Sequence, residues 1–527
     1  MSRIERTITG LLLAFSLLGN VYGQVWRGIV VDGETGEPLS YASLVDTLKK
    51  EGTVTNERGV FLLKASSETV VEVKHAGYVS AYFSLSTFNP DDFLSFGLKT
   101  RSVDTVQIDG THPATLGMIG RISFSPTQVR DLPALGGEPD LVKALQMLPA
   151  VSGGREGSGA LHVRGGSAGQ NLYIIDGMPI NHSGHLFNLF SVFNPDVLGN
   201  VDFYASGFPL RYGGRLSSVV DVGIREGNRN KWKGKAELGV VSSRVLVEGP
   251  LSKKSSLLLG LRSSYLDLFN LGKARQIEAE RWEPRQMTNL GFSDFNGKYV
   301  FSPDPTKKFS LSLYAGHDRL LDLRNDLIAS FRDKQNMLNA GASARFQWVP
   351  NSAWYMEVGL FSVLNRSWLE TENMDFRRTV IEPPDSLRFL LPEVELDTLQ
   401  IDRASGVYQL LNTGAYWRAD YTFNNQHHLK AGIQTAANVF WPGDLSVINE
   451  SREPDLLITE EDGSALRRQA FEWSAYTGYA GTFGTKLNLD IGLRYAGFSQ
   501  DNQTYTHVLP RMLVSWRPGP WGAIQLA

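Results

Sequence analysis

The stretch that decides the fold is VRGGSAGQNLYIIDGMPINHSGHLFNLFSVFNPDVLGNVDFYASGFPLRYGGRLSSVVDVGI, from Val163 to Ile224. Three glycine-containing motifs follow one another in it at short intervals, at Val163–Gly166, Leu172–Gly177 and Tyr212–Ser218. A run of strand-forming residues such as Leu172–Ile175 that ends in Asp-Gly predicts a buried strand followed by a tight turn. One such motif alone identifies no protein class, and the specificity comes from the ordered set.

Three more motifs belong to that set, at Leu132–Asp140, Ala144–Pro149 and Phe193–Asp196. Taken together, residues 120 to 225 resemble the plug of a TonB-dependent outer-membrane transporter. The resemblance implies a plug motif made of Arg164, Gly165, Gly166, Asp176, Gly177, Tyr212, Gly213, Gly214 and Arg215.

Composition restricts the class of protein further. A chain of 527 residues is too long for one ordinary domain, so several cores are expected. A net charge of -3 and a pI near 6.3 give no basic field, which excludes nucleic acid as an expected partner. Because the chain has no cysteine, it has neither disulfides nor a lipid-modified N-terminal Cys.

The N-terminus resembles a secretory signal peptide. Arg3 and Arg6 precede an apolar run from Ile8 to Leu18, with a cleavage site expected near Gln24. The run is too short for a membrane-spanning helix, and the alternative is a buried helix of the mature protein. Residues 1–23 are therefore predicted to be a signal peptide.

Residues 24–99 predict a small all-β unit, because short strand-forming runs alternate with Gly- and Pro-containing turns at the spacing of a β-sandwich. The segment resembles the carboxypeptidase regulatory-like domain, a prealbumin-like β-sandwich. Neither a zinc ligand set nor a general base is visible in it. The resemblance implies an accessory module with a structural or docking role.

Residues 100–119 form a linker that carries an isolated extended pentapeptide, Asp104, Thr105, Val106, Gln107 and Ile108. Its position resembles that of a TonB box. An unpaired strand on a flexible tether can add its backbone edge to a sheet of another protein. The alternative is a plain linker strand.

The predicted plug, residues 120–228, is an α/β unit. Glu138-Pro139-Asp140 leads into an amphipathic helix over Leu141–Leu148, with acidic residues near its positive end. Strands are predicted at Ala160–Arg164, Leu172–Ile175, Val201–Tyr204 and Val219–Ile224. The irregular segments Ser152–Gly159 and His182–Phe193 supply the candidates for a ligand-contacting apex, namely Arg155, His182, His185, Phe187 and Phe190.

From residue 229 to 527 the pattern is one of repeated amphipathic strands. In Lys486–Tyr495, apolar residues alternate with Asn, Asp, Gly and Arg, so one face suits lipid and the other water. This predicts the first part of an antiparallel transmembrane β-barrel. The polar stretches Glu370–Gly406 and Pro442–Arg468 are read as extracellular loops. The fold class is thus mainly β: an N-terminal sandwich, an α/β plug and a partial, truncated barrel.

The number of strands suggests a fragment. Transporters of the resembled family close a barrel of twenty-two strands, whereas the section after Asn228 supplies only about ten to twelve at roughly 25 residues per strand and connection. The expectation is that the sequence is part of a longer gene product.

Catalytic signatures are missing from the sequence. It contains no Gly-x-Ser-x-Gly elbow, phosphate-binding Gly-Lys-Ser/Thr loop or His-Glu-x-x-His helix, so we expect no enzyme and no cofactor. His182 and His185 lack a third ligand, and no metal site is expected. Arg164, Asp176, Arg211 and Arg215 are candidates for ion pairs between the plug and the barrel wall, the alternative being solvated turn charges.

The resulting hypothesis is TonB-dependent import of a scarce nutrient, such as a ferric chelate, corrinoid, glycan or peptide, across the outer membrane. The resemblance implies TonB-ExbB-ExbD and outer-membrane lipid as partners, delivery of the ligand by a surface lipoprotein as one option, and a periplasmic N-terminal unit. Two alternatives stay open: a surface signalling receptor that does not import, and a soluble periplasmic β-sandwich protein. The substrate does not follow from the sequence.

Overall fold

The computed structural model describes the chain from Gln24 to Leu526 with gaps. The described residues are 24–39, 42–49, 52–56, 59–75, 78–99, 121–124, 134–135, 138–153, 160–186, 188–267, 273–274, 277, 285–326, 329–351, 353–381, 393–424, 426–451, 460–464, 467–484, 486–519 and 522–526. The predicted signal peptide, the linker with Asp104–Ile108, and the apex candidates Arg155 and Phe187 lie outside this set.

The N-terminal unit consists of two small sheets around one core. One sheet has the order β4-β1-β7 and the other β3-β2-β5-β6. The strands are β1 (Gln24–Asp32), β2 (Ser43–Asp46), β3 (Gly52–Val54), β4 (Val60–Ala65), β5 (Val70–Lys74), β6 (Ala81–Ser84) and β7 (Phe93–Leu98), with the short 3-10 helix η1 (Leu85–Thr87) after β6. Trp26, Phe61 and Phe96 are almost fully buried between the sheets. The two layers bury the apolar side of each alternating strand, as a sandwich requires.

The central unit is built on a five-stranded sheet of order β14-β13-β18-β17-β8. Its strands are β8 (Arg121–Phe124), β13 (Leu172–Ile175), β14 (Met178–Ile180), β17 (Leu198–Tyr204) and β18 (Val219–Ile224). Two-stranded pairs accompany it: β9 (Ala134–Leu135) with β10 (Glu138–Pro139), β11 (Val151–Gly153) with β12 (Leu161–Val163), and β15 (Gly184–His185) with β16 (Phe190–Ser191).

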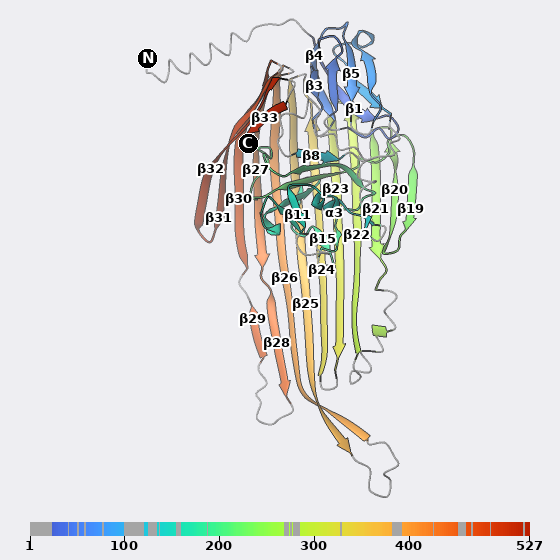
Figure 1. The fold of residues 1–527 in the computed structure, drawn as a ribbon, viewed down its shortest axis with the longest axis vertical. Coiled ribbons are helices and arrows are strands. Elements are labelled where there is room, and N and C mark those ends of the chain that lie inside the picture. Colours follow the sequence, from blue (N-terminus) through green and yellow to red (C-terminus); the bar gives the residue numbers. More distant parts are fainter. Residues whose placement is uncertain are drawn as a thin grey trace.

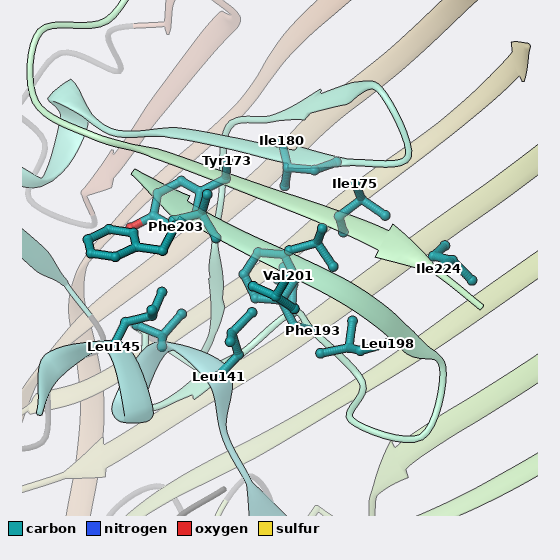
Figure 2. Close-up of a cluster of buried hydrophobic side chains, with 14 of the residues drawn as sticks. Leu141, Leu145, Tyr173, Ile175, Ile180, Phe193, Leu198, Val201, Phe203 and Ile224 are labelled. Carbon is teal, nitrogen blue, oxygen red and sulfur yellow. The ribbon is translucent and has the colours of Figure 1, made fainter. Parts of the chain in front are cut away.

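Helix α3 (Leu141–Gln146) covers one face of this sheet (Figure 2). It begins at Asp140, whose Oδ1 accepts a hydrogen bond from the Lys143 backbone N–H at 3.0 Å, as an N-cap side chain does. The helix buries Leu141 and Leu145 against Phe193, Val201 and the strands behind them. A 3-10 helix, η3 (Ala168–Gln170), precedes β13 and carries a capping box between Ser167 and Gln170.

Residues 233 to 526 contribute fifteen strands to one antiparallel sheet in the described part of the chain. The path is β19 (Lys233–Leu238), β20 (Ser242–Ser252), β21 (Ser255–Ser264), β22 (Arg285–Asp304), β23 (Lys307–Asn325), β24 (Ala329–Trp348), β25 (Trp354–Ile381), β26 (Glu393–Asn424), β27 (His427–Trp441), β30 (Arg468–Phe483), β31 (Leu487–Gln500), β32 (Gln503–Gly519) and β33 (Gly522–Leu526). Two shorter strands, β28 (Asp444–Ser451) and β29 (Glu460–Ser464), extend the sheet beyond β26. We call this sheet the wall.

The wall alternates in the inverse sense of a water-soluble sheet. On β23, Phe309, Leu311 and Leu313 are more than a third exposed, whereas Ser310 and Ser312 on the other face are buried. On β31, Leu493 is 47% exposed and its neighbour Arg494 only 5%. Polar side chains therefore face the enclosed side, and apolar side chains cover the outside, which is the pattern of a sheet that faces lipid. The expected fold class, mainly β with a partial antiparallel barrel around a plug-like unit, is confirmed.

The two stretches predicted to be loops contain strands, so the prediction of irregular structure is wrong there, while their extracellular location stays a prediction. β25 and β26 continue to Ile381 and from Glu393, so most of Glu370–Gly406 is a long hairpin, and β28 and β29 lie within Pro442–Arg468. Polar residues on both faces of a stretch give no alternating pattern and therefore predict a loop. They are equally compatible with a hairpin that continues into water, because the backbone hydrogen bonds that hold a ladder need no apolar side chain. The strand count consequently exceeds the expected ten to twelve.

Figure 1 shows how the three parts lie together. The central unit lies against the inner side of the wall, which curves around it, and the N-terminal unit sits at one end of the wall strands. The long hairpin of β25 and β26 extends from the opposite end. The core of the central unit continues into the wall, since Leu246, Leu258 and Phe361 of the wall belong to the same buried cluster as Leu141 and Phe203.

Candidate functional site: the contact between central unit and wall

Asp176 of the central unit makes polar contacts with several residues of the wall at once. Its side chain is 1% exposed and forms ion pairs with Lys298 of β22 at 3.0 Å and Arg345 of β24 at 2.7 Å. Ser312 of β23 donates to the carboxylate at 2.6 Å, and Ser343 of β24 donates to the Asp176 carbonyl at 2.9 Å. Three adjacent wall strands thus hold one carboxylate.

The local sequence explains why Asp176 reaches the wall. Asp176 and Gly177 both have positive φ, at 48° and 84°, and form the two-residue connection between β13 and β14. Positive φ at both central residues is the geometry of a type I′ hairpin, for which Asp-Gly is a preferred sequence. The tight turn places the carboxylate at the tip of the hairpin. Gly177 also lies against Tyr416 of β26, whose hydroxyl would be 3.2 Å from an added Cβ.

A second contact links the start of α3 and strand β15 to strands β20–β23. Glu138 is 3% exposed and pairs with Arg262 of β21 at 3.1 Å and Arg244 of β20 at 3.2 Å. Arg262 also donates to Asp294 of β22 at 2.7 Å and to the Ser191 carbonyl at 2.7 Å. The guanidinium of Arg262 therefore holds a carboxylate and a carbonyl of the central unit as well as a carboxylate of the wall.

His185 completes this contact. It is 1% exposed, and its two ring nitrogens lie 2.7 Å from Asp294 and 3.0 Å from Asp318 of the wall. Burial lowers the pKa of His185, but the two carboxylates outweigh burial and raise the pKa to about 9. At neutral pH the imidazole is thus a cation that donates from both nitrogens. Its ring stacks on Phe292 of β22, with centroids 4.7 Å apart.

The third contact holds the turn at Phe208–Tyr212 through its carbonyl groups. Arg494 of β31 donates to the Leu210 carbonyl at 2.7 Å, and Arg511 of β32 donates to the Pro209 and Tyr212 carbonyls at 2.7 and 2.8 Å. The Leu210 side chain enters a hollow left by Gly478 and Gly492, where an added Cβ would be 2.3 or 2.1 Å from Leu210 Cδ1. The wall glycines make room for the turn, and the wall arginines hold it.

The three predicted motifs come together inside the central unit. Ser217 donates to the Val163 carbonyl at 2.9 Å, and an added Cβ at Gly166 would meet the Ser217 hydroxyl at 2.4 Å. β13, which ends at Asp176, runs parallel to β18, the strand that follows Ser218. The glycines of the first motif thus allow a close approach of the third motif, which positions the Asp176 hairpin.

The predicted charged residues are not equivalent. Asp176 forms close ion pairs with the wall. Arg211 lies 3.9 Å from Asp221 and donates to Tyr212 within the central unit, and it also lies near enough to Asp420 and Tyr476 of the wall to interact with them electrostatically. Arg215 is exposed and donates to the neighbouring Gly214 carbonyl. Arg164 is exposed as well, with a positive φ of 51°. The cations in the contacts described above are mostly wall residues that no motif of the sequence singles out.

The ligand-apex candidates also separate into two groups. His185 and Phe190 are buried, and Phe190 packs on Phe292 with ring centroids 5.6 Å apart. His182 is exposed, and its backbone carbonyl accepts a hydrogen bond from Asn339 of β24 at 3.1 Å. In this conformation His185 and Phe190 pack against the wall, and of the described candidates only His182 has an exposed side chain.

Among the residues that the structure describes, no group of three or more His, Cys, Asp or Glu side chains is arranged to hold a metal ion. The described helices include none that is long and apolar enough to cross a membrane.

Comparison with known proteins identifies the central unit. Residues 126–220 match the family model of the TonB-dependent Receptor Plug Domain, so this unit is a plug domain of that type. Members of that family are not enzymes, in agreement with the missing catalytic signatures. No curated protein matches the chain.

Three solved structures illustrate what the chain is similar to. They are the transporter YddB from Escherichia coli (12% identity, 75% of this chain and 58% of that chain, TM-score 0.48), the RagAB peptide importer in the closed-closed state (11%, 76% and 57%, 0.49) and a ferric enterobactin receptor mutant, PfeA, from Pseudomonas aeruginosa in complex with enterobactin (13%, 77% and 61%, 0.44). The chain therefore spans less than two thirds of the length of each of these three.

Proposed function

We propose that the protein acts in the outer membrane as a receptor that imports a scarce nutrient by TonB-dependent active transport. The observation that carries the proposal is the plug domain at 126–220, seated by buried ion pairs against the inner side of a wall with an apolar outer face. A plug that fills the space enclosed by the wall and is held there by polar contacts can close a path and be released from it. Release is what active transport through such a path requires.

The outer face of the wall supports a membrane location. Four apolar side chains of this face are 45% to 57% exposed, namely Val358 and Leu360 on β25, Ile433 on β27 and Leu493 on β31. Exposed apolar side chains on neighbouring strands form a band that water would not favour and that lipid would cover. The alternative of a soluble periplasmic sandwich would require polar residues on this face.

The proposed energy-coupling partner is the TonB-ExbB-ExbD complex. Asp104–Ile108 lies in the 100–120 segment that connects β7 of the N-terminal unit to β8 of the plug. β8 is an edge strand of the plug sheet and pairs only with β17 among the described strands. A pull on the segment would thus act on β8, which has one neighbour among the described strands. Strand addition by Asp104–Ile108 would attach TonB to the segment.

The ligand is proposed to enter from the side of the long β25–β26 hairpin, opposite the N-terminal unit. The exposed side chain of His182 is the described apex candidate available to it. Nothing in the described side chains selects one nutrient among ferric chelates, corrinoids, glycans and peptides. Delivery of the ligand by a surface lipoprotein is one mode of capture within this proposal.

Binding of TonB tests the proposal without knowledge of the nutrient. Membranes that contain the protein are extracted in detergent and passed over the immobilised periplasmic domain of the host TonB. We expect retention of the wild type, and loss of retention for Val106→Pro, because proline removes the backbone donor that strand addition requires. The matched control is His112→Pro, just outside the pentapeptide, which should be retained. Equal retention of both variants, or none of the wild type, would refute the TonB assignment.

A further inference from the structure

The turn that follows β1 in the N-terminal unit is shaped by its own side chains. Asp32 Oδ1 accepts from the backbone N–H groups of Glu34 and Thr35 at 2.7 and 2.8 Å, and Asp32 Oδ2 accepts from the Tyr78 hydroxyl at 3.0 Å. Asp32 is 7% exposed. The conformation of the turn Asp32–Glu37 is therefore stabilised by hydrogen bonds within the N-terminal unit itself.

Glu37, at the end of this turn, is buried against the plug and the wall. It is 7% exposed and accepts from Arg225 Nε at 3.2 Å and from the Gly227 backbone N–H at 3.0 Å. Arg225 follows the last plug strand directly and donates through its Nη2 to both carboxylate oxygens of Glu248 on β20, each at 2.8 Å. Through Nη1 it donates to the Asp196 carbonyl of the plug at 3.3 Å. One guanidinium thus joins the N-terminal unit, the plug and the wall.

Further contacts surround this ion pair. The Arg229 backbone N–H donates to the Thr35 carbonyl at 2.9 Å, and the Asn230 side chain donates to the Glu34 carbonyl at 2.9 Å. Lys233 Nζ lies 2.6 Å from Glu34 Oε1. Gly36 packs directly on Arg229, since an added Cβ would be 3.4 Å from the Arg229 Cβ. One short turn thus contributes backbone hydrogen bonds, a buried charge and close packing. This combination is typical of a specific interface.

We propose that the Asp32–Glu37 turn is a docking element that fixes the N-terminal unit to the Arg225–Lys233 segment, where the plug chain passes into the wall. The docking is a property of the chain and does not depend on the proposed transport. Its consequence does rest on the proposed function. Because Arg225 is shared, a plug that moves at β18 must disturb the Glu37 contact, so undocking of the N-terminal unit and displacement of the plug favour one another.

A double-cysteine variant tests the docking directly. The wild type has no cysteine, so Gly36→Cys with Arg229→Cys introduces the only thiols. A Cβ separation of 3.4 Å lies at the short end of the disulfide range, and the left-handed φ of 76° at position 36 adds modest strain. A sequence-specific protease site inserted after Thr111 separates the two cysteines along the chain. After oxidation in the membrane and cleavage, we expect the two fragments to stay linked until reduced.

The matched control pairs Arg229→Cys with Leu48→Cys, since Leu48 lies in the same N-terminal unit and is 86% exposed. We expect at least a tenfold lower yield of linked fragments. Equal yields of linked fragments for the two cysteine pairs would overturn the docking. The docking would also be overturned if Gly36→Cys with Arg229→Cys forms no link and the cleaved, otherwise unsubstituted chain loses its N-terminal fragment.

Retention of the cleaved N-terminal fragment is a second measurement that needs no cysteine. With the protease site alone, the fragment should stay bound to the remainder after cleavage. Glu37→Arg places a cation against Arg225, and we expect about 100-fold faster release, because breaking a buried pair leaves an uncompensated charge. Glu34→Gln, which removes only the outer pair with Lys233, should change release less than about fivefold. Similar release of the two variants would contradict the assigned role of Glu37.

Hydrogen exchange separates the docking from its consequence. In the uncleaved chain, Glu37→Arg should accelerate exchange of the amides in β18 while TonB retention is unchanged. Unchanged exchange in β18 with confirmed release of the fragment would refute the coupling to the plug and leave the proposed function untouched. If the wild type does not bind TonB, the proposed function is refuted and the docking is not affected.

Discussion

Asp176 shows how one side chain can fix a whole unit inside the wall. Its carboxylate is buried among Lys298, Arg345 and Ser312, so it compensates part of the charge of the two wall cations that contact it. Buried pairs of this kind are often not strongly stabilising relative to apolar residues, but removal of one partner is costly because the other charge stays buried. The site therefore specifies where the plug sits more than it stabilises the fold.

Asp176→Asn tests that view at a single residue. Asparagine tolerates the positive φ of 48°, so the turn should persist while the negative charge is lost. We expect the plug–wall contact to lose about 3 kcal/mol, the lower end for a broken buried pair. The measurement is the urea concentration at which the plug becomes sensitive to protease in the membrane. Arg215→Gln, at an exposed turn position, is the control and should stay within about 0.5 kcal/mol of the wild type.

His185 predicts a dependence of plug seating on pH. Because its pKa is raised to about 9 by Asp294 and Asp318, with Arg262 as the nearby opposing charge, the protonated ring stabilises the seated plug. The pKa of an unfolded histidine is about 6.5, so the stabilisation of the seated plug by the protonated ring is complete below about pH 6.5. This stabilisation is lost as the pH rises through about 9. Protease sensitivity of the plug should therefore increase between pH 7 and 10. His185→Gln should be more sensitive at pH 7 and should lose most of this increase; a variant with the full wild-type pH response would exclude His185 as its cause.

At the scale of elements, the sequence predicted the parts whose signals are local. β13 and β18 have the bounds expected from their strand-forming runs, and α3 begins at Leu141, behind Asp140, as predicted. The Asp-Gly pair located the hairpin tip because turn geometry depends on two adjacent residues. The wall partners could not be predicted, since Lys298 and Arg345 lie more than a hundred residues away and their position depends on the register of three strands. The polar hairpin of β25 and β26 was missed for a related reason, as its ladder is set by pairing and not by composition.

The fit between the Phe208–Tyr212 turn and the wall gives a prediction for packing. Gly478→Ala would bring a methyl group to 2.3 Å from Leu210 Cδ1, so the turn must shift away from Arg494 and Arg511. We expect a loss of about 1–3 kcal/mol from overpacking. Leu210→Ala removes the opposing atoms, and the double variant should be less destabilised than the sum of the two single variants. Thermal denaturation of the purified protein measures all three; strict additivity would mean that the two residues do not meet.

The outer face of the wall predicts an effect that distinguishes lipid from water. Leu360 on β25 is 57% exposed, and in water Leu360→Arg would be close to neutral. In a bilayer we expect a cost of about 2–4 kcal/mol near the midplane. Glu370→Arg, ten residues further along β25, breaks an exposed ion pair with Lys334 and should cost about 1 kcal/mol or less in either medium. Folding yields into lipid vesicles, compared with stability in detergent, give the measurement, and equal effects of the two substitutions would argue against a membrane-facing wall.

The whole molecule combines three units whose contacts converge on a short part of the chain. β18 ends at Ile224, Arg225 binds Glu37 and Glu248, and the wall begins at Lys233. Glu226 lies in the same segment: burial raises its pKa, but Lys308, Arg229 and Lys298 outweigh burial and hold the pKa far below its ordinary value. The segment from 225 to 233 is thus a charged joint, at which the N-terminal unit, the plug and the wall are connected through a few ion pairs.

The central claim is that the plug lies inside the curve of the wall, and a disulfide between the two tests it most directly. Val197 of the plug and Gly260 of β21 face one another, since a Cβ added at Gly260 would be 3.8 Å from the Val197 Cβ, a separation well suited to a disulfide. In outer membranes that carry Val197→Cys with Gly260→Cys, and a protease site between the two positions, oxidation should link the fragments almost completely. Fragments that separate without reductant, although both thiols remain reactive in the unfolded chain, would show that the plug does not occupy the inside of the wall.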